Sequence, residues 1–192
     1  MPRWIALFRG INVGGNNVLP MKELVGHLEA LKLKNVRTYI QSGNVVFDTD
    51  EKNTKSLAKK IKERIEREQG FGPEVLLISR EELQKAIQAN PFPHAVSDPK
   101  SLHFFFLEKP APKANIPALD LAKAPTESYV LNGSVFFLHA PEGVGRSKLA
   151  ATAERHLGVA ATARNYRTVE KIAELANQVQ LGKKVDCRQS RR

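Results

Sequence analysis

The chain opens with an apolar run, a glycine-rich loop and a helical stripe. Residues 4–8 are all apolar, and Arg9 and Gly10 end the run, which is typical of a buried strand. After the loop, apolar residues recur at helical spacing over residues 21–31, so that one face is apolar and the other polar. The pattern predicts a strand, a loop and an amphipathic helix, in that order.

The next elements complete a four-stranded unit. Two strand-like runs, residues 36–40 and 45–47, flank a Gln-Ser-Gly-Asn turn in which glycine or asparagine can take the positive φ that a hairpin needs. Residues 52–69 carry apolar positions at four-residue steps among many charged ones, and residues 74–78 form a last apolar run. The order β-α-β-β-α-β is that of a ferredoxin-like unit, which we place at residues 1–79.

A second unit follows a connector. Ser79 and Glu82 have the spacing of a capping box, and a proline-rich stretch follows, so residues 80–101 are assigned to a short helix and a connector. The same order of elements then recurs over residues 102–181, with an additional helix at its end whose predicted N-cap is Thr168. We therefore expect an α+β fold in which two ferredoxin-like β-α-β-β-α-β halves pack together with an extra C-terminal helix.

The two predicted hairpins share a spacing that suggests an internal duplication. Tyr39, Gly43, Val45 and Phe47 recur as Tyr129, Gly133, Val135 and Phe137, at a constant offset of 90 residues. Strand and turn formers coincide by chance in many hairpins, so the matching order of elements is what favours duplication.

Composition and charge narrow the class of partner. Thirty Lys and Arg against twenty Asp and Glu give a net charge of +10, which favours nucleic acid, phosphorylated metabolites or an anionic membrane face. Residues 182–192 are basic and patternless, which predicts a disordered tail. A single cysteine, Cys187, excludes an intramolecular disulfide and a zinc cluster of several thiolates. No apolar run has the length of a signal-peptide core or a membrane span, so we expect a cytoplasmic protein that does not bind a membrane.

Two glycine-rich loops, residues 10–17 and 143–148, each precede a predicted helix. Glycines let backbone amides point toward a ligand, and a helix N-terminus favours negative charge, so both loops suit an anion. Neither loop has the spacing of a P-loop or of the dinucleotide-binding fingerprint. That these glycines simply turn the chain stays as the alternative.

The candidate ligand-binding residues are polar or cationic and lie at loop and strand ends. Arginine and asparagine there supply donors for phosphate or for base edges. We expect the loops after the first and third strands to leave the same edge of the sheet, so that the docking of the halves decides whether one site forms. The candidates are Arg9, Gly10, Asn12, Gly14, Gly15, Asn16, Gln41, Asn44, Arg146, Ser147, Lys148, Arg164, Asn165 and Arg167.

The histidines and carboxylates form no recognisable catalytic set, metal site or cofactor motif. His94, in the proline-rich connector, is the least constrained candidate for acid–base work. These patterns favour a cytosolic binding module for an anionic ligand, with nucleic acid ahead of a phosphorylated small molecule because of the net charge. An enzyme acting on a phosphate-bearing small molecule and a protein-interaction module without a ligand remain the alternatives, and the sequence leaves the oligomeric state open.

Four segments resemble a bacterial family of unknown function, number 1697. They are LFRGINVGGNNVLPM (residues 7–21), VRTYIQSGNVVF (36–47), GVGRSKL (143–149) and TARNYRTV (162–169), and the likeness extends from Trp4 to Leu175. Where relatives often carry tryptophan, this chain has Tyr166, which keeps a flat ring and adds a hydroxyl. The resemblance implies a compact α+β fold of two similar halves, and it supplies no activity, cofactor or catalytic residue.

Overall fold

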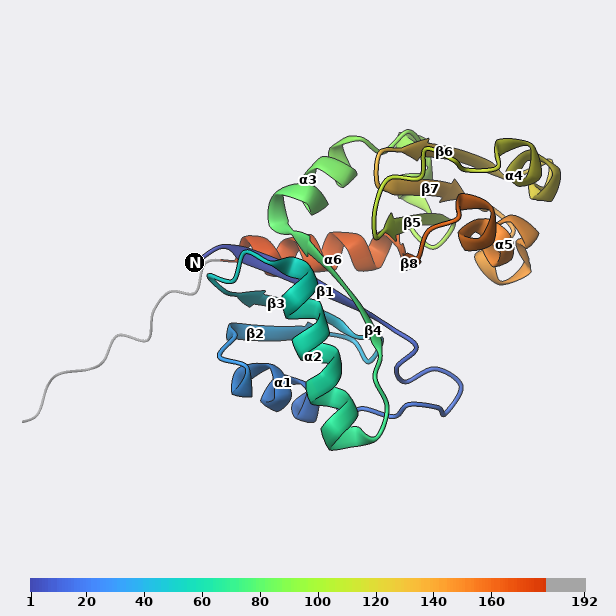
Figure 1. Ribbon diagram of the computed structural model, residues 1–192. Coiled ribbons are helices and arrows are strands. Elements are labelled where there is room, and N and C mark those ends of the chain that lie inside the picture. The colour runs from blue at the N-terminus through green and yellow to red at the C-terminus, as the bar shows by residue number, and fades with distance from the viewer. Residues whose placement is uncertain (179–192) are drawn as a thin grey trace, which may run out of the picture.

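The computed structural model describes residues 1–178 (Figure 1). The predicted basic tail, residues 182–192, lies outside the described residues. The first half consists of β1 (Arg3–Arg9), α1 (Met21–Ala30), β2 (Lys34–Tyr39), β3 (Asn44–Asp48), α2 (Thr54–Gln69) and β4 (Glu74–Ser79). The connector holds α3 (Arg80–Gln88) and the 3-10 turn η1 (Pro93–Ser97). The second half consists of β5 (Leu102–Leu107), α4 (Ile116–Ala122), β6 (Ser128–Asn132), β7 (Val135–His139), the 3-10 turn η2 (Val144–Arg146), α5 (Lys148–Leu157) and β8 (Ala161–Asn165), and α6 (Tyr166–Asn177) follows it.

The strands form two four-stranded antiparallel sheets of the same topology. The first has the order β2-β3-β1-β4 and the second the order β6-β7-β5-β8. Each order is that of a ferredoxin-like unit, so the predicted α+β fold of two similar halves is confirmed. No helix among residues 1–178 is long and apolar enough to cross a membrane.

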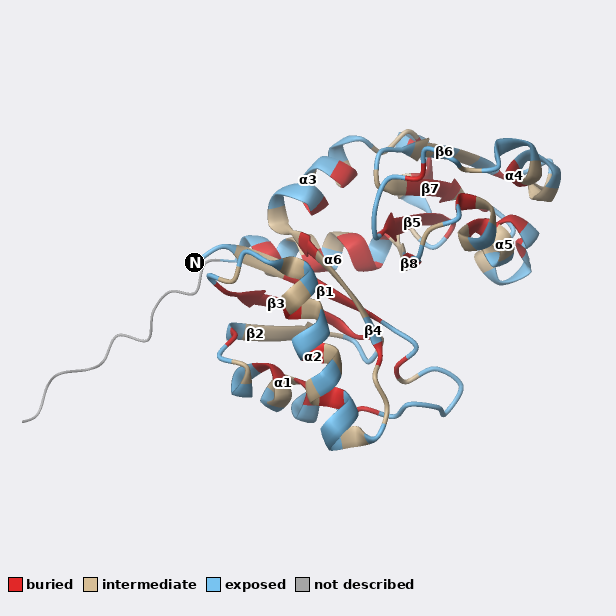
Figure 2. Cartoon of the chain, viewed as in Figure 1, coloured by how far each residue is buried: buried red, intermediate tan, exposed pale blue. Residues whose placement is uncertain are grey.

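The two sheets share a core that contains α6 (Figures 1 and 2). α1 and α2 cover the outer face of the first sheet, and α4 and α5 cover the outer face of the second. Between the sheets, Leu7 of β1 and Phe104 of β5 belong to one buried cluster with Val169 and Ile172 of α6, and α3 contributes Leu83. The C-terminal helix is therefore not an addition to the second half, because its apolar face packs against both sheets.

Local signals place most helix ends where the sequence predicts them. The Ser79–Glu82 capping box is present, and Ser147 caps α5 by accepting a hydrogen bond from the Ala150 amide at 2.9 Å. The predicted N-cap Thr168 is wrong. Asn165 caps α6 instead, with its Oδ1 accepting from the Thr168 amide at 2.9 Å, because β8 runs directly into the helix.

The duplicated arrangement is present, but residues 90 positions apart in the two hairpins lie on opposite faces of their sheets. Val45 and Phe47 face α1 and α2, whereas Val135 and Phe137 face the central core. The turn between β2 and β3 spans residues 40–43, and the turn between β6 and β7 spans only two residues. Since successive side chains of a strand point to opposite faces, positions that share a face in the two hairpins are separated by an odd number of residues, and not by 90.

The expectation that the loops after the first and third strands share an edge is also wrong. β1 and β3 are antiparallel, so their following loops leave opposite edges of the sheet. The loop after β1 instead meets the β2–β3 turn, where the Phe8 amide donates to the Gly43 carbonyl at 2.8 Å. Gly43 has φ +70°, and a Cβ there would lie 2.5 Å from the Cβ of Phe8. This close approach places the turn beside the glycine-rich loop.

Candidate ligand-binding site between the two halves

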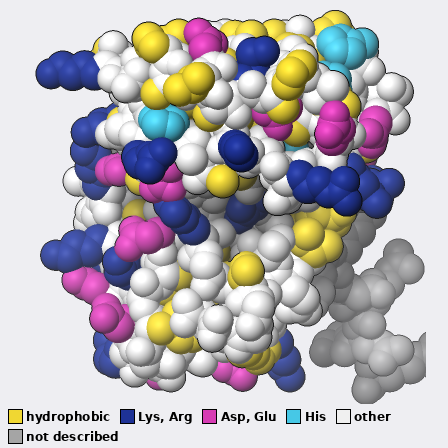
Figure 3. Space-filling model, turned by 90° about the vertical axis from the view of Figure 1, so that its right-hand side faces the viewer, with side chains coloured by type: hydrophobic (Ala, Val, Ile, Leu, Met, Phe, Trp, Pro, Cys, Tyr) yellow, Lys and Arg dark blue, Asp and Glu magenta, His cyan; other side chains and the backbone are white. Residues whose placement is uncertain are grey.

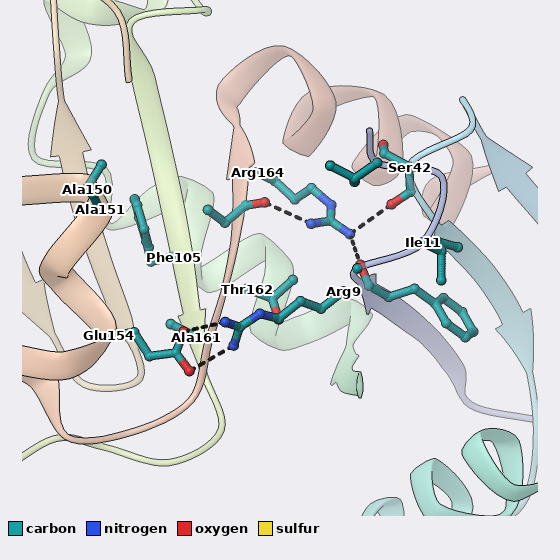
Figure 4. Close-up of a pocket in the computed structure, with 14 residues that line it drawn as sticks. Arg9, Ile11, Ser42, Phe105, Ala150, Ala151, Glu154, Ala161, Thr162 and Arg164 are labelled. Atoms are coloured by element: carbon teal, nitrogen blue, oxygen red, sulfur yellow. Dashed lines mark hydrogen bonds and ion pairs between the residues drawn. The ribbon is translucent and has the colours of Figure 1, made fainter. Parts of the chain in front are cut away.

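A cavity of about 360 Å³ lies where the two halves meet. The first half contributes the end of β1, the loop after it and the β2–β3 turn, and the second half contributes β8, Phe105 of β5 and the first turns of α5. The surface in Figure 3 is hollowed between the halves, with Lys and Arg side chains in and around the hollow. Figure 4 shows Arg9, Thr162 and Arg164 from opposite halves in this cavity.

Arg164 links β8 to the first half through its guanidinium (Figure 4). Its Nη2 donates to the Phe8 carbonyl at 2.7 Å and to the Ser42 carbonyl at 3.2 Å, and its Nε donates to Oδ1 of Asn44. Its Nη1 donates to the Ala163 carbonyl at 2.8 Å. All four acceptors are neutral, and burial lowers the pKa of Arg164 to about 10, so the group stays charged at neutral pH without a carboxylate partner.

Arg9 forms the second link between the halves. Its Nη1 lies 2.8 Å from Oε1 of Glu154 and its Nη2 lies 2.7 Å from Oε2, which is a bidentate ion pair between the end of β1 and α5. The Arg9 side chain is 47% exposed and the Glu154 side chain 41% exposed. The hydrogen bond to Glu154 raises the pKa of Arg9.

Asn12 holds the glycine-rich loop in place. Its Nδ2 donates to the carbonyls of Leu19 at 2.9 Å and Gln41 at 2.8 Å, and its Oδ1 accepts from the Leu19 amide at 2.7 Å. The tip is closed by the Asn16 amide, which donates to the Val13 carbonyl at 3.1 Å. The side-chain amide of Asn12 and the backbone carbonyl of Gln41 therefore hold the loop in its conformation.

A strained residue marks the neighbouring turn. Ile40 has φ +49° and is 52% exposed. β-branched residues rarely adopt this left-handed conformation, and such strain costs of order 1–3 kcal/mol. The turn holds it because Gly43 and Asn44 are buried on its other side, where Nδ2 of Asn44 donates to the Tyr39 carbonyl at 3.1 Å.

The model of a family described as a protein of unknown function (DUF1697) matches residues 1–137. The chain belongs to the DUF1697 family. Of the four resembling segments, residues 7–21 and 36–47 lie inside the matched range, and residues 143–149 and 162–169, with Arg164, lie beyond it.

A solved structure shares the DUF1697 fold seen here. The conserved bacterial protein SP0830 from Streptococcus pneumoniae is similar with a TM-score of 0.69, over 91% of this chain and 98% of that chain. Its sequence is 24% identical, so the likeness concerns the fold alone. No curated protein matches the chain.

The structure brings together only part of the candidate set in this DUF1697 chain. Three of the fourteen candidates, Arg9, Gly10 and Arg164, line the cavity. Asn44 is buried behind Arg164, and Ser147 and Asn165 serve as helix caps. The remaining candidates do not line the cavity, although Asn12 and Gln41 shape it through the loop; they are Asn12, Gly14, Gly15, Asn16, Gln41, Arg146, Lys148 and Arg167.

Sequence reasoning missed the residues that complete the wall. Glu154 sits on the solvated face of an amphipathic helix, where its pattern is that of any surface carboxylate. Ser42, Phe105 and Thr162 belong to a turn and to strand interiors. No local spacing marks them, because the cavity exists only after the halves dock.

A second cavity of about 550 Å³ adjoins the first. Arg9, Glu154 and Thr162 line both cavities. Most of the remaining wall comes from α2, including Lys62, and from β4, including Glu74, which pairs with Lys62, and the second half adds Glu108 and Ala160.

The histidines lie away from both cavities. The rings of His94 and His139 are 5.2 Å apart at the connector, and burial, followed by the charge of His94, lowers the pKa of His139. His103 is buried in β5, and its burial lowers its pKa. Within residues 1–178, no group of three or more His, Cys, Asp and Glu side chains is arranged to hold a metal ion.

Proposed function

We propose that the chain is a binding module for a small phosphorylated molecule, which it holds in the cavity between the two halves. The observation that supports this most is Arg164, a partly buried guanidinium whose hydrogen bonds all go to neutral oxygens. A buried charge without a counterion is costly, and an anion in the adjoining cavity would supply that counterion.

The cavity offers donors as well as charge. A guanidinium has five N–H groups, and Arg164 uses four, so one hydrogen on Nη1 remains for a ligand oxygen. The amides of Gly10 and Ile11, at the start of the loop, donate to no other described residue. Donors of this kind, set around one cation, suit the several oxygens of a phosphate group.

The dimensions favour a small ligand over nucleic acid. A volume of about 360 Å³ lies at the lower end of the range for small-molecule pockets. The exposed cations Arg146, Lys148 and Arg167 do not gather at the cavity, as a groove that follows a nucleic-acid backbone would require. Net charge had favoured nucleic acid, and the position of the charges favours a metabolite.

Thermal unfolding with added ligands tests the proposal. Inorganic phosphate, pyrophosphate, a sugar phosphate and a nucleoside monophosphate are compared with chloride at matched ionic strength. A ligand at about 100 times its dissociation constant adds about 2.7 kcal/mol of stability, which raises the Tm of a chain of this size by roughly 5–10 °C. Isothermal titration calorimetry then gives the stoichiometry, for which we expect one ligand per chain.

Variants separate the cavity from the rest of the surface. Arg164→Gln is expected to abolish binding, and Arg167→Gln, an exposed cation outside the cavity, is the matched control that binds normally. Ala151→Leu fills the cavity from the exposed face of α5 without touching the guanidinium, so it tests the site even if Arg164→Gln folds poorly. Undiminished phosphate binding by both cavity variants would refute the proposal, as would salt-sensitive binding of a single-stranded oligonucleotide alone.

A further inference from the structure

The Arg9–Glu154 ion pair places a carboxylate inside the proposed ligand cavity. Both Glu154 oxygens lie within 2.8 Å of the Arg9 guanidinium, in the two-pronged geometry that arginine also offers to a phosphate or to a ligand carboxylate. In Figure 4 the pair stands across the cavity from Arg164. The protein therefore already fills one anion position with a side chain of its own.

This pair can exchange its partner at little cost. Ion pairs as exposed as this one contribute little to stability, since water screens the charges and two long side chains must be ordered. Arg164 differs, because its partly buried hydrogen bonds to Phe8, Ser42 and Asn44 fix its position. Of the two arginines that line the cavity, Arg9 is the one that can turn toward a ligand.

We propose that Glu154 competes with the ligand for Arg9, so that binding transfers the Arg9 guanidinium from the Glu154 carboxylate to the anionic group of the ligand. This inference rests on the proposed function and deepens it. A ligand must displace a tethered bidentate carboxylate, so the site selects phosphates and similar oxyanions over halides and neutral molecules. Glu154 thereby sets both the affinity and the chemical class of the ligand.

The transfer also affects the second cavity. Arg9 and Glu154 line both cavities, so their pair forms part of the wall between them. When Arg9 turns toward the ligand, this part of the wall opens. The body of an organic phosphate then gains access to the apolar floor of the second cavity, which Val75 and Leu77 of β4 provide.

A double-mutant cycle with inorganic phosphate as the probe tests the competition. Calorimetric titrations compare the wild type, Glu154→Gln, Arg9→Gln and the double variant. We expect Glu154→Gln to bind phosphate roughly two- to fivefold more tightly, the range that corresponds to the free energy of an exposed ion pair. Arg9→Gln weakens binding, and the double variant matches Arg9→Gln because no guanidinium is left to compete for.

The matched control is Glu81→Gln, which removes the carboxylate of another exposed ion pair, Arg80–Glu81, whose residues line neither cavity. Its phosphate affinity should equal that of the wild type. Glu154→Asp keeps the charge on a shorter side chain and should give a smaller gain than Glu154→Gln. It provides a second measurement should Glu154→Gln fold poorly.

Each outcome supports or overturns the competition between Glu154 and the ligand for Arg9. Unchanged or weaker binding by Glu154→Gln means that the pair only joins the halves, and this overturns the inference. An equal gain with and without Arg9 means that Glu154 merely repels the anion, and this also overturns it. If Arg164→Gln loses binding and Glu154→Gln shows no gain, the proposed function stands and only the competition is rejected. If both cavity variants, Arg164→Gln and Ala151→Leu, bind normally, the proposed function itself is rejected.

Discussion

Replacing Arg164 with glutamine should destabilise the whole fold, because the Arg164 side chain donates hydrogen bonds to four acceptors in the two halves. Hydrogen bonds from a charged donor contribute about 1.5–3 kcal/mol each, so the four together supply at least about 6 kcal/mol. Burial opposes them: a fall of the Arg164 pKa from 12.5 to about 10 corresponds to about 3 kcal/mol against the charged form. The hydrogen bonds outweigh the burial penalty, and a net loss of about 3 kcal/mol is expected for Arg164→Gln.

Urea unfolding followed by circular dichroism measures this loss. About 3 kcal/mol lowers the Tm of a domain of this size by roughly 6–12 °C and lowers the urea midpoint with an unchanged m-value. Arg164→Lys keeps the charge on one nitrogen, which cannot reach all four acceptors, so it should lie between the glutamine variant and the wild type. Arg167→Gln serves as the control. An Arg164→Gln chain within about 0.5 kcal/mol of the wild type would refute the reasoning, because such a small change is what a surface substitution gives.

Three further predictions concern single residues. Gly43→Ala should destabilise the chain by about 2 kcal/mol or more in urea unfolding, because the new Cβ meets Phe8 at 2.5 Å in a backbone with positive φ; a change below about 0.5 kcal/mol would contradict the close approach. Asn165→Ala should lower the unfolding free energy by about 1 kcal/mol through loss of the α6 cap, and an unaltered Tm would argue against that cap. Burial raises the pKa of Asp48, but the hydrogen bonds from Arg3 and Asn35 outweigh this effect, so the pKa is lowered overall. The stability that Asp48 contributes is therefore present above the ordinary carboxyl pKa. It is lost as the pH falls through the lower pKa of the folded state. Asp48→Asn should remove this part of the acid dependence in a series of urea titrations, and an unchanged pH profile would exclude the role of Asp48.

Features that depend on neighbouring residues were predictable from the sequence. The capping box at Ser79 and Glu82, the cap at Ser147 and the glycine at the end of α5 are each decided within a few positions of the chain. The order of elements followed from hydrophobic periodicity, and it was enough for the topology of each sheet. The offset between the hairpins does not align the two halves, because strand formers occur on both faces of a buried strand and an equal spacing does not show that matching residues share a face.

The candidate site shows the opposite case. Arg9 and Arg164 were recognisable because cations at strand ends are unusual enough to notice, but their partners were not. Glu154 lies 145 residues from Arg9, and no period or motif connects them. The glycines after β1 predicted a loop correctly, yet the loop is held by hydrogen bonds from Asn12, one of them to the Gln41 carbonyl in the β2–β3 turn, which no local pattern indicates.

The position of α6 between the sheets determines when the protein can complete its structure. On the ribosome, the first half emerges with Ile5 and Leu7 on a sheet face that no segment before α3 covers. That face stays incompletely covered until nearly the last described residues leave the exit tunnel, since α6 ends at Asn177. The nascent chain therefore exposes an apolar, aggregation-prone surface through most of its synthesis. A chain truncated before α6 is expected to be a substrate for chaperones and proteases.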